Sequence, residues 1–253
     1  GCSPGTMVKP ASFMRRRTAF KGEFYAILLF AVLAVSLMAG ANDLVLVALS
    51  IEFLSISSYI LTGFLRGDAL SAEGALKYFL YGSIAGAVML FGLSLLYGLA
   101  GSTSVPVVTA VLADPERILA GNVASLALPA LVLVLVGLSF KIALVPFHQW
   151  SPDAYQGAPT PVTAFLSVGP KLAGFAVLAR LLMTAFAAPA YSSHWLATLA
   201  GIAVLTMVFG NIVALAQSDI KRMMAYSSIA QAGYMLVGLV AVGTAGTGGG
   251  AVA

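Results

Sequence analysis

Apolar residues follow one another in seven long runs, and most of the charged residues lie between these runs. A helix needs about 20 apolar residues to cross the roughly 30 Å of hydrocarbon in a bilayer. Strands of a membrane barrel would instead alternate apolar and polar positions. The pattern therefore predicts an all-α, polytopic bundle of transmembrane helices. The expected spans are Glu23–Gly40, Leu44–Leu65, Leu76–Gly98, Val123–Val145, Pro161–Ala185, Leu196–Ala216 and Met223–Val242.

The composition excludes the soluble classes of protein. Of the 253 residues, 60% are hydrophobic and only 9% are charged, whereas an ordinary soluble domain is about 25% charged. So few charges cannot cover a water-exposed surface, which excludes a soluble enzyme, a disordered tail and a nucleic-acid binder. We therefore expect an integral, multi-pass protein that contacts the lipid bilayer and no nucleic acid.

The basic residues predict the orientation of the spans. Five of the thirteen Lys and Arg residues precede the first run, so residues 1–22 are expected to form a basic cytoplasmic segment. If the spans alternate in direction, three further basic residues fall on that side and two on the other. The three are Arg66, Lys221 and Arg222, and the two are Arg117 and Arg180.

The residue counts limit the cofactor chemistry of the chain. Cys2 is the one cysteine, so no internal disulfide is possible. Two histidines cannot form a multi-ligand metal site without carboxylates, and no Gly-rich dinucleotide fingerprint occurs. We therefore expect no metal and no cofactor in this chain. Because the sequence opens with Gly1 and stops just after a Gly-rich stretch, we also expect it to be a fragment of a longer protein.

Four of the charged residues inside the predicted spans stand out, namely Glu52, Lys77, Lys141 and Lys171. A charge at mid-bilayer costs about 2.5–3.5 kcal/mol on insertion-based scales. One interpretation is that Glu52 and one lysine form a buried ion pair that only fixes the helix register. Three lysines against one carboxylate favour a proton relay, because burial disfavours the charged form of an unpaired lysine. Lys77 lies near the start of its span, where it can also extend to the surface.

The fourth span carries Pro146 within apolar sequence, which predicts a broken helix. Backbone groups freed by such a break are tolerated in a bilayer only where protein or water surrounds them. Transporters build ion sites at broken helices. We expect two half-helices separated near Leu144–Pro146, with Lys141 facing the interior. His148 follows seven residues after Lys141 and is either a relay member or a structural histidine.

A polar stripe precedes Lys171 in the fifth span. Thr160, Thr163 and Ser167 recur at intervals of three and four residues, so they share one helix face. Hydroxyls both donate and accept hydrogen bonds, so such a stripe can carry a chain of water. We expect it to face Lys141 across the interior.

The last span carries a weaker polar stripe, formed by Ser227, Gln231 and Tyr234. The charged residues before it are typical of a solvated helix start. They are Asp219, Lys221 and Arg222.

Two local patterns predict details of packing. Gly82 and Gly86 form a GxxxG pattern, which either allows close helix contact or reflects the abundance of glycine in membrane helices. Asp114 and Pro115 are typical of a helix start, which predicts a short surface helix in the loop between the third and fourth spans.

Two longer blocks resemble a known family. Residues 145–162 read VPFHQWSPDAYQGAPTPV, and residues 219–234 read DIKRMMAYSSIAQAGY. Both resemble the antiporter-like membrane subunits of proton-translocating NADH–quinone oxidoreductase, or respiratory complex I. The form SPDAYQGAP is similar to subunit N of that family, the counterpart of mitochondrial subunit 2. Subunits of Mrp-type antiporters and membrane hydrogenases carry similar blocks.

The resemblance implies a role for each charged position. Glu52 and Lys77 match the glutamate and lysine of the family's fifth and sixth helices, Lys141 the lysine of the broken seventh, and Lys171 that of the eighth. Residues 23–185 would then be one complete five-helix inverted-repeat unit that holds a proton channel. Residues 186–253 would begin a second, truncated unit.

The resemblance also implies a function and partners. A change in the Glu52–lysine pairing would drive a proton from Lys141 toward Lys171, through His148 and water. Flavin mononucleotide, iron–sulfur clusters and quinone would be bound by other subunits. The partners would be other membrane subunits of complex I, in a bacterial plasma membrane or a mitochondrial inner membrane. The alternatives are a subunit of a sodium/proton antiporter or membrane hydrogenase, and a structural subunit without its own proton path.

Overall fold

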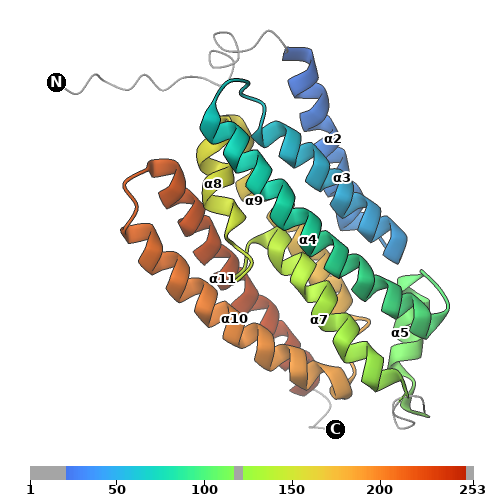
Figure 1. Ribbon diagram of the computed structural model, residues 1–253. Helices are drawn as coiled ribbons and strands as arrows, with labels where there is room; N and C mark the ends of the chain where they lie inside the picture. The colour runs from blue at the N-terminus through green and yellow to red at the C-terminus, as the bar shows by residue number, and fades with distance from the viewer. Residues whose placement is uncertain (1–20, 117–121, 249–253) are drawn as a thin grey trace.

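The computed structural model describes residues 21–116 and 122–248, and all the regular elements in these ranges are helices (Figure 1). Seven of the helices are long and apolar enough to cross a membrane, which confirms the predicted all-α, seven-span architecture. The helices are α2 (Lys21–Gly40), α3 (Leu44–Thr62), α4 (Ala69–Ala100), α5 (Val105–Ala113), α7 (Asn122–Ile142), α8 (Trp150–Gly157), α9 (Thr160–Met183), α10 (Pro189–Leu215) and α11 (Ile220–Gly248).

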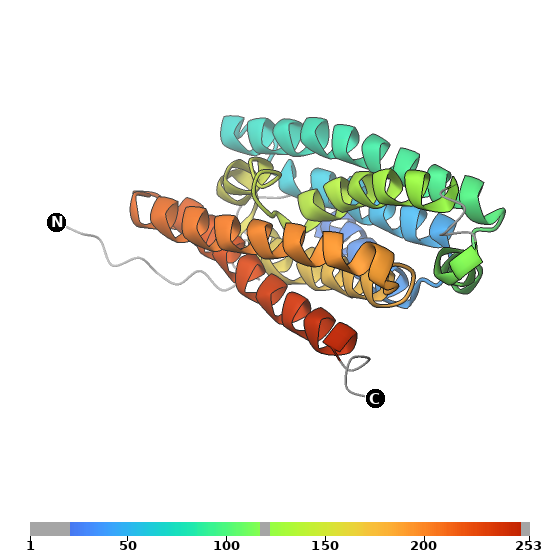
Figure 2. The ribbon, with the colours of Figure 1, turned by 90° about the horizontal axis from the view of Figure 1, so that it is seen from below.

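The long helices run side by side, and α10 and α11 form an antiparallel pair along one edge of the bundle (Figures 1 and 2). The short helix α8 lies at one end, and the loops that precede α4 and α11 lie at the same end (Figure 1). At the other end, Arg180 of α9 donates to the carbonyl oxygens of Ala39 and Ala41, beside the end of α2. A guanidinium at a helix C-terminus satisfies carbonyls that have no partner within the helix.

Aspartate caps explain where two of the spans begin. The Asp43 carboxylate accepts the N–H groups of Val45 and Leu46 at the start of α3. Asp68 caps α4 in the same way, so α4 begins seven residues before the predicted Leu76. The extra turns are too polar to belong to an apolar run, and the cap sets the true start.

The connection between α4 and α7 contains a helix that the sequence did not indicate. This helix, α5, begins after Ser104 and buries Val105, Val108 and Leu112. Asp114 ends α5, and its carboxylate accepts the N–H of Glu116, as expected for the predicted helix start. The rest of the segment predicted to form that helix lies outside the described residues, and so does Arg117.

Candidate functional site

The fourth span is broken where the sequence predicted. Helix α7 ends at Ile142, and Ala143 follows in the left-handed conformation with φ 59°. The N–H of Leu144 donates to the Ser139 carbonyl (2.9 Å), and the N–H of Ala143 donates to the Phe140 carbonyl (3.1 Å). This pair of bonds is the Schellman motif, in which glycine usually takes the left-handed position. Lys141 therefore lies in the last turn of a helix, where the dipole favours a positive charge.

Side chains from other helices satisfy the backbone around the break. The Trp150 indole N–H donates to the Phe140 carbonyl across the break (2.9 Å). The Trp150 ring is stacked on Tyr78 of α4, with centroids 4.0 Å apart and planes 6° apart. The N–H of Val145 donates to the Thr206 hydroxyl of α10 (3.1 Å). The break is thus bonded within the protein, as a bilayer requires.

Lys141 faces the interior, as predicted, and its side chain is 1% exposed. Its Nζ donates to the Ser55 hydroxyl of α3 (2.8 Å), which itself donates to the Ile51 carbonyl (2.7 Å). Glu52 lies one turn before Ser55, close enough to interact with the Lys141 charge. Among the described residues, however, no carboxylate lies within 4.0 Å of Lys141 as an ion-pair partner. Its direct partner is a neutral hydroxyl.

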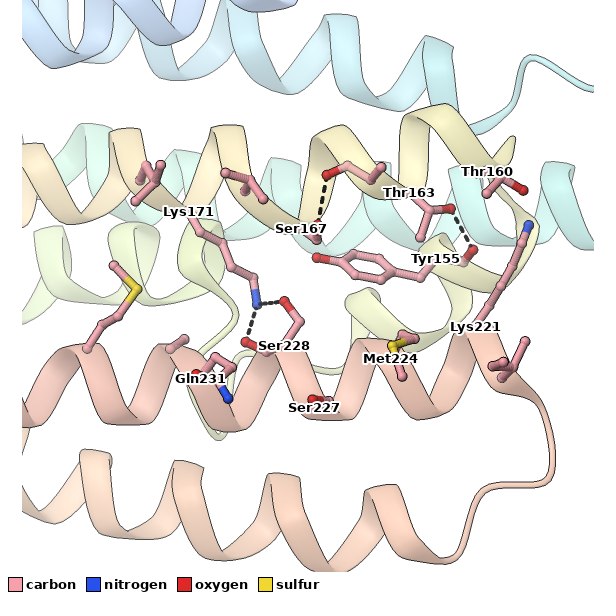
Figure 3. Close-up of a pocket in the computed structure, with 16 residues that line it drawn as sticks. Tyr155, Thr160, Thr163, Ser167, Lys171, Lys221, Met224, Ser227, Ser228 and Gln231 are labelled. Atoms are coloured by element: carbon pink, nitrogen blue, oxygen red, sulfur yellow. Dashed lines mark hydrogen bonds between the residues drawn. The ribbon is translucent and has the colours of Figure 1, made fainter. Parts of the chain in front are cut away.

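Lys171 is also buried, at 5% exposed, and it also binds neutral acceptors. Its Nζ donates to the carbonyl and the hydroxyl oxygens of Ser228 on α11, both at 2.7 Å (Figure 3). Ser228 is not part of the polar stripe predicted for this span. Of the three residues in that stripe, Ser227 and Gln231 line the same cavity as Lys171, and Tyr234 is 45% exposed.

The predicted hydroxyl stripe lines a cavity of about 670 Å³ between α9 and α11 (Figure 3). Thr160, Thr163 and Ser167 lie along one wall, and Lys171 reaches across to the opposite helix. The expectation that the stripe faces Lys141 needs correction, because the cavity lining does not include Lys141. The stripe faces α11 instead, since α9 turns this side toward the last helix of the chain.

Lys77 has partners that the sequence analysis missed. Its Nζ lies 2.6 Å from the Glu73 carboxylate and 2.8 Å from the Asp153 carboxylate of α8, and its side chain is 41% exposed. Asp153 also binds Arg222 of α11. Burial raises the pKa of Asp153, but hydrogen bonds from Lys77 and Arg222 outweigh burial and hold this pKa below its ordinary value.

The sequence predicted that the charged residues at the start of α11 are simply solvated, but in the structure they bind other parts of the protein. Lys221 donates to the Ala158 carbonyl at the end of α8 (2.7 Å), and Arg222 donates to the Gln156 side chain (3.1 Å). The N–H of Arg222 donates to Asp219, which also accepts from Gln156 (3.4 Å). These cations hold the C-terminal end of a helix, where positive charge is favourable. We call the four charged side chains around this helix the α8 clamp: Lys77, Asp153, Lys221 and Arg222.

His148 lies between the break and α8, and it is 7% exposed. Its ring packs against Phe209 of α10, with centroids 4.7 Å apart, and lies farther from Tyr226 of α11. Burial lowers the pKa of His148, which favours the neutral ring. Its part in a relay stays a prediction. Within residues 21–116 and 122–248, no three His, Cys, Asp or Glu side chains come together as metal ligands would.

Comparison with known proteins agrees with this geometry. The transmembrane family described as NADH:quinone oxidoreductase/Mrp antiporter matches residues 41–252. The NAD(P)H-quinone oxidoreductase subunit 2 of Gloeothece citriformis is 48% identical over 241 residues, which are 95% of this chain and 46% of that protein. This chain therefore spans about half the length of the curated relatives that it matches.

Two solved structures share the fold. One chain of respiratory complex I from Thermus thermophilus with bound aureothin is 43% identical, with a TM-score of 0.71 over 88% of this chain and 46% of that one. One chain of the Mrp complex from Dietzia sp. is 24% identical, with a TM-score of 0.73 over 85% of this chain and 38% of that one. The Mrp likeness, at this identity, shows the fold alone. The family match covers most of the sequence, and the chain belongs to the NADH:quinone oxidoreductase/Mrp antiporter transmembrane family.

Proposed function

We propose that this chain is a proton-translocating part of a membrane subunit of NADH–quinone oxidoreductase. The proposal rests on the surroundings of two lysines. Lys141 and Lys171 are buried, and their ammonium groups donate to hydroxyl or carbonyl oxygens. A lysine bonded to neutral oxygens can lose its proton without leaving a bare carboxylate behind. A lysine in an ion pair cannot do so as easily, because the pair stabilises its charge.

The cavity beside α9 gives protons a route to Lys171. Its lining combines hydroxyl groups with apolar side chains and includes the Lys171 ammonium. Hydroxyls can hold a chain of water, along which a proton moves by exchange of hydrogen bonds. Lys171 would exchange its proton with water on this side.

Glu52 would set the charge state of Lys141. The carboxylate is close enough to stabilise the ammonium, although Ser55 is the direct partner. A charge change in a neighbouring membrane subunit would move or neutralise Glu52, and Lys141 would then release its proton toward Lys171. His148 lies beyond the break and would act between the two lysines through water.

The same proposal assigns the redox chemistry, the repeat units and the orientation in the membrane. Redox chemistry, with flavin, iron–sulfur clusters and quinone, would take place in other subunits. Residues 23–185 would form one five-helix channel unit, and residues 186–253 would begin the next. The end of the bundle with the α8 clamp would face the cytoplasm of a bacterial cell, because most of the basic residues lie there. The subunit 2 relatives, at 48% identity, support a quinone oxidoreductase over an antiporter.

The Glu52→Gln variant tests the proposal. It removes the negative charge and keeps the size and shape of the side chain. In membrane vesicles that contain the assembled complex, we expect a smaller NADH-driven pH gradient at an unchanged amount of complex. A full gradient from the assembled variant would refute the relay, and would leave a structural subunit as the better interpretation.

A further inference from the structure

Two glycines of α4 give room to polar side chains of α3. A Cβ atom at Gly86 would lie 2.5 Å from Glu52 Oε1, closer than real Cβ contacts. A Cβ atom at Gly82 would overlap the Tyr59 hydroxyl. The GxxxG pattern of this helix therefore accommodates a carboxylate and a phenol. Helices α3 and α4 pack side by side (Figure 1).

Other glycines of α4 meet different neighbours. Gly74 faces the backbone of Asp153, and Gly92 faces the backbone of Ala130, as in close helix packing. Gly98 has no atom within 4 Å of its Cβ position. At Gly86 the three nearest atoms all belong to the Glu52 carboxyl group, at 2.5, 3.5 and 3.9 Å. The contact is specific to the one acidic side chain inside this span.

The place of this carboxylate matters for Lys141. Ser55, one turn along α3 from Glu52, holds the Lys141 ammonium at 2.8 Å. Electrostatic interaction falls with distance. Lys141 is fully buried and Glu52 partly buried, so solvent screens their interaction less than it would at the surface. A methyl group at Gly86 would displace the Glu52 carboxylate and change the distance between this carboxylate and the Lys141 ammonium. The absence of a side chain at Gly86 thus determines how closely the Glu52 carboxylate can approach α4.

We propose that Gly86 is a positioning residue for Glu52. Because Gly86 has no side chain, it leaves the space that the Glu52 carboxylate occupies near the Ser55–Lys141 contact. The proposal rests on the proton relay proposed above, and it adds a residue that touches no proton itself. Gly82, one turn earlier on α4, leaves room for the Tyr59 hydroxyl in the same way.

The test uses Gly86→Ala in the assembled complex, with the NADH-driven pH gradient as the measurement. Overpacking of a filled interior forces neighbouring side chains to move, so we expect the gradient to fall by about fivefold or more. Gly98→Ala is the matched control, because it lies on the same helix in open space, and it should pump like the unaltered complex.

A second substitution separates positioning from general damage. Glu52→Asp shortens the side chain by one methylene, so its carboxylate lies farther from Gly86. In the Glu52→Asp background, Gly86→Ala should therefore reduce the gradient by less than about twofold. If Gly86→Ala prevents assembly, the double variant should restore it.

Each outcome decides between the proposals. An equal loss from Gly86→Ala in both backgrounds, or no loss in either, would overturn the positioning role. The same holds if the double variant fails to restore assembly. The Glu52→Gln result is independent of these comparisons: if Glu52→Gln pumps poorly while Gly86→Ala pumps normally, only the positioning role fails. If Glu52→Gln pumps normally, the relay itself fails.

Discussion

Lys77 and Lys171 are the same residue type in two contrasting surroundings. Lys77 lies at the end of the bundle, 41% exposed, between the carboxylates of Glu73 and Asp153. Lys171 lies inside, 5% exposed, and its partners among the described residues are the two oxygens of Ser228. Lys141 resembles Lys171 in both respects.

The contrast distinguishes a lysine whose charge is fixed by carboxylates from one that, in the proposed function, exchanges its proton. Two carboxylates stabilise the ammonium of Lys77, so this side chain stays charged. A hydroxyl can instead donate to a neutral amine or accept from an ammonium, so it tolerates both states of a lysine. We infer that Lys77 serves the α8 clamp, and that the relay runs through Lys141 and Lys171.

Arginine substitutions at the two positions should give the largest difference. Arginine keeps the positive charge but does not release its proton in proteins. Lys171→Arg should therefore lower the NADH-driven pH gradient by about tenfold or more, whereas Lys77→Arg should retain most of it, because arginine can still bind both carboxylates. The pH gradient in vesicles with equal amounts of complex measures both. Similar losses at the two positions would remove the distinction between them.

The Ser228 hydroxyl should matter less than Lys171 itself. Ser228→Ala leaves the backbone carbonyl as one acceptor and removes the other. A hydrogen bond to a charged group contributes about 1.5–3 kcal/mol, and part of that can be replaced by water in the cavity. We expect the gradient to fall by about fivefold. Ser227→Ala is the matched control, because Ser227 lines the same cavity without bonding Lys171. If both variants pump equally, the hydroxyl does not support the relay.

The sequence predicts the spans well because each span is an apolar run, and burial in lipid depends on composition alone. It misses the starts of α4 and α10, each by seven residues, and the whole of α5. The first turns of α4 are polar, and Asp68 caps them outside the apolar run. Helix α5 has only nine residues, and its buried face is recognised only once it packs against the bundle.

The site is predicted only in part, because its partners come from distant parts of the chain. Lys141 and Lys171 are noticeable as charges in apolar sequence, but Ser55 and Ser228 are ordinary serines until the helices are placed. Asp153 lies 76 residues from Lys77 and 69 from Arg222, and no local pattern connects them. The rotation of α11 decides that Ser228 rather than Ser227 binds Lys171.

The α8 clamp should affect stability more than pumping. Asp153→Asn removes the charge that Lys77 and Arg222 share, and we expect a loss of about 1 kcal/mol, because the group is partly exposed. The pKa of Asp153 is lowered in the folded protein, so the clamp stabilises at neutral pH. This contribution is lost as the pH falls through the lowered pKa. Thermal unfolding of the purified complex in detergent at several pH values measures it. A difference between variant and unaltered protein that persists in acid would contradict the charge-based clamp.

The smallest effect is expected at the backbone turn after Lys141. Ala143 has φ 59°, a conformation that costs an L-residue roughly 1 kcal/mol and costs glycine little. Ala143→Gly relieves this strain, but it loses a fully buried methyl group worth about 0.8 kcal/mol and adds entropy to the unfolded chain, so we expect its stability to change by less than about 0.5 kcal/mol. Gly101, which ends α4 at φ 65° with no atom within 4 Å of its Cβ position, provides the reciprocal control. Gly101→Ala should lower the stability, because the same strain is then introduced in open space. Thermal unfolding of both variants measures the two shifts, and the loss in Gly101→Ala should be the larger. A loss of more than about 1 kcal/mol in Ala143→Gly would mean that the Ala143 methyl group packs well enough to outweigh the backbone strain beside Lys141.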